Sequence, residues 1–144
     1  MNMKWLLFAT LAAVFYLLHD YLLKGVSTRL NPVLSSLLLS AASLLLLGGY
    51  LGGQLLLGAR LDRVAGADVR VIGAAGLFLA LASVCFLKTF ENHAPFSVAI
   101  PYIYVVMIVL GVVFGRVFLR EQVSAWQLVG VALSCVGLFL VVKK

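Results

Sequence analysis

The chain has 144 residues, of which 64% are hydrophobic and only 11% are charged. A soluble domain of average composition is roughly 45–50% apolar and about 25% charged, so this composition excludes an ordinary soluble protein. The formal net charge of +6 does not indicate nucleic-acid binding, because the lysines and arginines flank long apolar runs, where anionic lipid headgroups are their natural partners. We therefore expect an integral membrane protein.

Five apolar runs are separated by short charged connectors, and each is close to the roughly 17 to 25 residues that a helix needs to cross a bilayer. They cover residues 5–23, 33–57, 71–87, 94–115 and 126–142. None of the connectors is long enough to form a catalytic domain. The sequence therefore predicts an all-α membrane protein, with a single five-span domain over residues 1–144.

The first run carries the ionisable side chain that is most unusual for a membrane helix. Tyr16 and Asp20 are four residues apart and therefore share one helical face. A carboxylate inside a membrane favours a functional role, so we expect both to line a substrate cavity. The alternative is an interfacial ion pair between Asp20 and Lys24, one turn further on. His19 is a second candidate for proton coupling, or else an interfacial residue.

Small and kink-forming residues mark the next runs. Ser36, Ser40 and Ser43 recur at helical spacing, which favours close helix packing over a polar lining. In the fourth run Pro101 frees a backbone carbonyl, which a membrane tolerates beside a cavity. Tyr102 and Tyr104 add hydroxyls and rings that can stack on cations. We expect these three residues to contribute to the cavity, with core packing as the alternative for Tyr104.

The last connector and the last run carry a second group of candidates. Arg116 and Arg120 are one helical turn apart and could hold a phosphate or a lipid headgroup, or could simply extend to the membrane surface. Ser124 and Gln127 have the spacing of a capping box, which predicts a helix start. The final run sets three small residues along one face: Gly130, Ser134 and Gly137.

Taken together, these features resemble the EamA-type repeat of the drug/metabolite transporter (DMT) superfamily, which is related to the small multidrug resistance proteins and the aminoarabinose-lipid flippase subunits. The resemblance is sharpest from Pro95 onward and implies that Glu121 joins the turn to the helix. The family usually has glycine before this glutamate, where this chain has Arg120. The membrane-embedded glutamate of the small multidrug resistance proteins falls at about Tyr16.

This resemblance implies a small transporter that works as a dimer by alternating access. The expected substrate is a small organic metabolite or drug-like cation, moved with proton exchange through Asp20. The alternatives are a flippase subunit for a lipid-linked sugar phosphate and a membrane protein that only binds others. We expect neither enzymatic activity nor a cofactor or metal, because catalytic and metal-binding motifs are absent from the sequence.

The resemblance also implies that the last span pairs with that of a second chain, through Gly130, Ser134 and Gly137. Basic residues leave the orientation nearly undetermined by the positive-inside rule. Six flank the spans on the side of the N-terminus (Lys4, Arg60, Arg63, Arg70, Arg116 and Arg120) and five on the other side (Lys24, Arg29, Lys88, Lys143 and Lys144). Either the N-terminus faces the cytoplasm with a weak preference, or the chain inserts in both orientations. We expect a homodimer in the bacterial inner membrane, antiparallel if both orientations insert, with a parallel homodimer or a heterodimer as alternatives.

Overall fold

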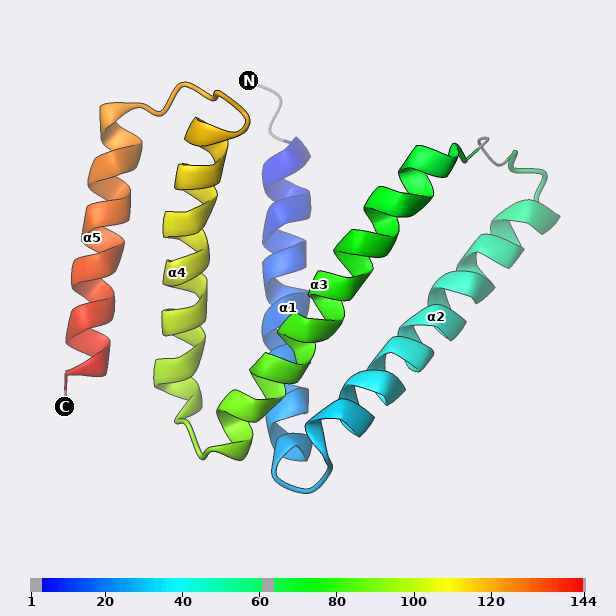
Figure 1. Cartoon of the computed structure of the whole chain (residues 1–144), viewed down its shortest axis with the longest axis horizontal. Helices are drawn as coiled ribbons and strands as arrows, with labels where there is room; N and C mark the ends of the chain where they lie inside the picture. The colour runs from blue at the N-terminus through cyan, green and yellow to red at the C-terminus, as the bar shows by residue number, and fades with distance from the viewer. Residues whose placement is uncertain (1–3, 61–63, 144) are drawn as a thin grey trace. The chain divides into compact units, whose positions relative to one another are not determined.

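The computed structural model describes residues 4–60 and 64–143 and forms five helices (Figure 1). They are α1 (Lys4–Ser27), α2 (Pro32–Leu56), α3 (Gly66–Glu91), α4 (Phe96–Val117) and α5 (Ala125–Val142). Each contains a segment that is long and apolar enough to cross a membrane. The predicted all-α, five-span architecture is therefore confirmed. Two of the residues counted for topology, Arg63 and Lys144, lie outside the described residues.

The helices extend beyond several of the predicted spans. Helix α1 continues to Ser27 and α3 runs from Gly66 to Glu91, whereas the predicted spans stopped at the charged residues. Charge ends a hydrophobic run but not a helix, because lysine and glutamate are good helix formers. Lys24 and Lys88 lie in the last turns of α1 and α3, where a positive charge interacts favourably with the helix dipole.

Side-chain caps define where two of the helices begin. The Asn31 side chain accepts a hydrogen bond from the backbone N–H of Val33 at 2.9 Å, which starts α2. At the start of α5, Ser124 Oγ accepts from the Gln127 N–H at 3.2 Å, and Gln127 Oε1 accepts from the Ser124 N–H at 2.7 Å. The capping box predicted from the sequence is therefore confirmed.

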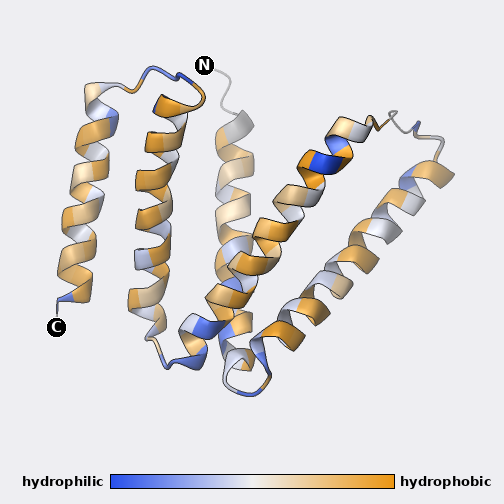
Figure 2. Cartoon of the chain, in the orientation of Figure 1, coloured by the Kyte–Doolittle hydropathy of each residue, from blue (hydrophilic) through white to orange (hydrophobic). Residues whose placement is uncertain are grey.

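The chain forms two compact units, Met1–His93 and Ala94–Lys144. Unit 1 contains α1, α2 and α3, and within it α3 packs against both other helices. Unit 2 is the pair α4 and α5, which pack against each other. Hydrophilic residues gather near the helix ends and in the connectors, as Figure 2 shows. The single domain over residues 1–144 stays a prediction.

Burial within unit 1 is confined to one end, which we call the converging end. It comprises the C-terminal part of α1, the first turns of α2 and the C-terminal part of α3 (Figure 1). There the Lys24 ammonium lies 6.0 Å from the centroid of the Phe90 ring, which joins α1 to α3. The described residues of unit 1 that are buried are Asp20, Ser27, Pro32, Ser35, Ser36, Leu87 and Phe90.

Candidate functional site

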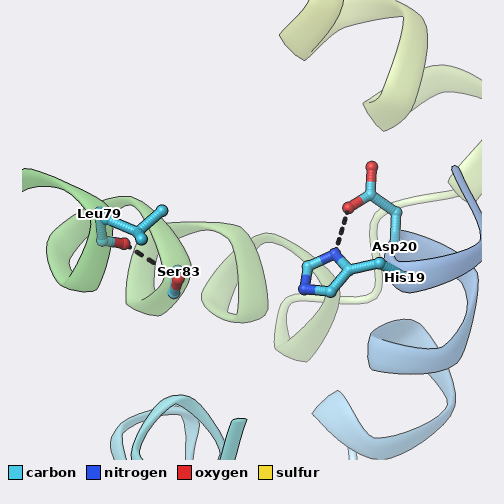
Figure 3. Close-up of polar contacts among 4 residues, drawn as sticks. All are labelled: His19, Asp20, Leu79 and Ser83. Atoms are coloured by element: carbon cyan, nitrogen blue, oxygen red, sulfur yellow. Dashed lines mark hydrogen bonds and ion pairs between the residues drawn. The ribbon is translucent and has the colours of Figure 1, made fainter. Parts of the chain in front are cut away.

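The carboxylate of Asp20 lies in the converging end and is only 5% exposed. Its Oδ1 is 3.0 Å from Nδ1 of His19, the preceding residue (Figure 3). Because α1 continues to Ser27, Asp20 lies about 10 Å along the helix from its last residue, at ~1.5 Å per residue. The end of the predicted span at Leu23 had placed it only about 5 Å from the end of the helix. Asp20 is thus deeper in the helix than the sequence indicated.

Tyr16 lies one turn before Asp20 but in a different environment. Its side chain is 61% exposed, and it lines a shallow concavity on α1 together with Ala12, Phe15 and His19. Tyr16 and Asp20, which the sequence placed on one helical face, therefore differ in environment: Tyr16 is exposed and Asp20 is buried. His19 connects the two, because it lines the concavity and also contacts the Asp20 carboxylate.

Three buried serines share the converging end with Asp20. Ser27 Oγ donates to the Lys24 carbonyl oxygen at 2.9 Å. The hydroxyls of Ser35 and Ser36 are buried without a hydrogen-bond partner. Sequence reasoning considered Ser36 for packing and missed Ser35. The available signal was the pair of adjacent serines at the start of an otherwise apolar helix.

In unit 2, the residues predicted to shape a cavity lie along α4. Pro101 is inside the helix, where its ring nitrogen cannot donate to the carbonyl of Ser97 in the preceding turn. Tyr102 is exposed and Tyr104 is partly buried, as two positions on nearly opposite faces of a helix can be. A cavity role for these three residues stays a prediction.

The two arginines predicted to hold a phosphate do not share a helical face. Helix α4 ends at Val117, so Arg120 lies in the connector beyond it. Arg116 Nη1 donates to the backbone carbonyl oxygen of Glu121 at 3.3 Å. Arg116 therefore stabilises the turn through this hydrogen bond. A phosphate or headgroup site at Arg116 and Arg120 stays a prediction, but the two side chains are not one turn apart on a helix.

The turn between α4 and α5 closes around Gly115 and Glu121. The Glu121 N–H donates to the Gly115 carbonyl oxygen at 3.0 Å, and its carboxylate lies over the buried Gly115. Between them Arg120 has a φ of 53°, in the left-handed region that favours glycine. These contacts with Gly115 give the expected role of Glu121, joining the turn to the helix, a structural basis. The left-handed backbone at Arg120 explains why the family usually has glycine at this position.

Helix α5 carries the small residues predicted to form a dimer interface. A Cβ built on Gly130 or Gly137 would meet no atom within 4 Å. Ser134 Oγ donates to the Gly130 carbonyl oxygen at 2.9 Å, so its hydroxyl is paired within the helix. None of the residues of α5 is buried. Gly130 and Gly137 are exposed, whereas Ser134 is partly buried.

The sequence matches the EamA-like transporter family over residues 3–143, nearly the full length of the chain. The chain belongs to this family. This EamA-like protein is therefore an integral membrane protein of the DMT superfamily. Its family is one of transporters and not of enzymes. No curated protein and no solved structure matches it. Within the described residues, no three His, Cys, Asp or Glu side chains gather as a metal site would require.

Proposed function

We propose that this EamA-like transporter moves a small organic cation across the bacterial inner membrane by alternating access, in exchange for protons. The observation that carries the proposal is the Asp20 carboxylate, buried within an apolar helix and in contact with His19. An ionisable group within a membrane span carries an energetic cost, so its presence favours a functional role.

A single buried carboxylate can couple two cations by competition. When Asp20 binds a proton it is neutral and no longer attracts a substrate cation. When it releases the proton, its negative charge favours substrate binding, so one site alternately serves both. In this proposal His19 positions the carboxylate, and the ring of Tyr16 offers a face on which a cation can stack. Tyr102 and Tyr104 are candidates of the same kind within unit 2. Pro101 leaves a backbone carbonyl of α4 without its usual helical donor.

The transport test uses purified protein in liposomes with an imposed pH gradient. Proton movement is recorded with a pH-sensitive dye inside the liposomes, relative to protein-free liposomes, for two cations of different chemistry, ethylammonium and tetramethylammonium. We expect cation-driven proton movement for the wild type and its loss for Asp20→Asn, which removes the charge while nearly preserving shape. Glu91→Gln is the matched control, because Glu91 is exposed at the end of α3 and should leave transport unchanged. Absence of cation-driven proton movement in the wild type for both cations would refute proton-coupled cation transport.

We further propose that two chains pair through α5, with Gly130, Ser134 and Gly137 at the contact. Small residues let helices approach closely in lipid, where packing drives association. The open space at both glycines supports this proposal. An antiparallel homodimer is the arrangement we favour, because inverted repeats commonly surround a transport site at the midplane. A parallel homodimer and a heterodimer with another small membrane protein are the alternatives.

Topology distinguishes these dimers. Single cysteines are placed near each terminus in a Cys85→Ala, Cys135→Ala background, since both native cysteines are exposed. Intact cells are then labelled with a membrane-impermeant reagent. Partial labelling at both termini supports dual insertion and the antiparallel homodimer. Labelling at one terminus alone contradicts it and leaves the parallel dimer or a second subunit.

A further inference from the structure

Two hydroxyl groups in the converging end differ from most helical hydroxyls of the chain. Ser35 and Ser36 are only 5% and 7% exposed, and neither Oγ has a hydrogen-bond partner. Several other serines and threonines in the helices donate to a backbone carbonyl one turn earlier, namely Thr10, Ser40, Ser83, Thr89 and Ser134. Ser83, which donates to Leu79 at 2.9 Å, shows this arrangement in Figure 3. Ser40, one turn after Ser36 on α2, donates to the Ser36 carbonyl oxygen at the same distance.

An unpaired buried hydroxyl destabilises a fold, because it loses its hydrogen bonds to water and gains none. Two adjacent cases at the start of α2 are therefore unusual in a native structure. Asn31 already caps this helix through its side chain, so the serines are not needed as caps. Their unpaired hydroxyls are instead available to form hydrogen bonds with a polar ligand.

We propose that Ser35 and Ser36 form the hydrogen-bonding part of the substrate site and select a primary ammonium group. This inference rests on the proposed cation transport. A primary ammonium has three N–H donors, and serine oxygens can accept them. Asp20, in the same end of unit 1, supplies the negative charge. The substrate reaches these side chains when the converging end opens during alternating access.

This division of roles makes a specific prediction about two cations of equal charge. Ethylammonium can donate hydrogen bonds to the serine oxygens, whereas tetramethylammonium has no N–H group and cannot. Removal of both hydroxyls should therefore weaken binding of ethylammonium only. Removal of the Asp20 charge should weaken binding of both cations. The two effects separate the recognition of charge from the recognition of hydrogen-bond donors.

The experiment compares wild type, Ser35→Ala/Ser36→Ala and Asp20→Asn in proteoliposomes. For wild type and the double serine variant, the cation concentration that gives half-maximal proton movement is measured with ethylammonium and with tetramethylammonium, and Asp20→Asn should transport neither cation. For the double serine variant we expect a rise of about tenfold or more for ethylammonium, from the loss of hydrogen bonds to a charged group, and no change for tetramethylammonium. Ser40→Ala is the matched control, since the Ser40 hydroxyl already donates to the backbone carbonyl oxygen of Ser36.

A stability measurement guards against a misfolded variant. Without substrate, the double serine variant should unfold in detergent at the same temperature as wild type or higher, because two unpaired hydroxyls are removed. A lower unfolding temperature would mean that the hydroxyls support the fold through an internal water or another chain, which overturns the inference. Equal effects on both cations, or none on either, also overturn it. If wild type carries neither cation, the proposed function itself fails.

Discussion

Replacing Gly115 with alanine tests how the turn between α4 and α5 is held. A Cβ at this position would lie 2.7 Å from Glu121 Oε2, and an ordinary contact begins at 3.4 Å, so the carboxylate must move by at least 3.4 − 2.7 = 0.7 Å. Glu121 is exposed and its carboxylate is the flexible end of the side chain, so rotating it away costs about 0.5–1.5 kcal/mol. Alanine regains about 1 kcal/mol through its higher helix propensity. We therefore expect Gly115→Ala to leave the free energy of unfolding within about 0.5 kcal/mol of the wild-type value.

A double-mutant cycle isolates the contact between the two residues. In a Glu121→Ala background the clash is gone, so Gly115→Ala should be neutral or stabilise by up to about 1 kcal/mol. The free energy of unfolding is measured by denaturant titration in detergent micelles, followed by the helical circular dichroism signal. We expect a coupling energy of about 0.5–1.5 kcal/mol. Equal effects of Gly115→Ala in the two backgrounds would refute the reasoning.

Three further substitutions probe local features by thermal unfolding in detergent. Arg120→Gly should stabilise the protein by up to about 1 kcal/mol, because it removes a left-handed backbone cost of ~1–2 kcal/mol and adds a smaller entropic one; a loss of stability would contradict this. Ser124→Ala should cost about 1 kcal/mol through loss of the α5 cap, whereas an unchanged unfolding temperature would rule the cap out as a stabilising feature. Phe90→Ala should cost about 3–5 kcal/mol, because its ring is buried in the converging end beside Lys24; a cost below 1 kcal/mol would argue against that core.

Features that depend on neighbouring residues could be predicted from the sequence. Apolar runs set the number of spans, and the Ser124 and Gln127 pair set the start of α5. Helix ends were less predictable, because charged residues such as Lys24 mark the end of a hydrophobic run and not of the helix. Arg120 shows the same limit, since the sequence placed it one helical turn from Arg116, whereas its backbone is in the left-handed region.

The candidate site depended more strongly on the packing of helices. The sequence singled out Asp20 because a carboxylate within an apolar run is rare and costly. It could not show that Asp20 is buried while Tyr16, one turn away, is exposed. It also missed Ser35, because a serine hydroxyl ordinarily pairs within its own helix and only the burial around it shows that this one does not.

By itself, then, the sequence determined the membrane class, the five helices, the cap of α5 and the family, because hydrophobicity and capping act over a few residues along the chain. The tertiary structure decided which polar groups lose contact with water. Burial depends on where α1, α2 and α3 converge, and that is set by residues far apart in the sequence, such as Lys24 and Phe90. For this reason the charged candidate could be found from the sequence, while its serine neighbours required the fold.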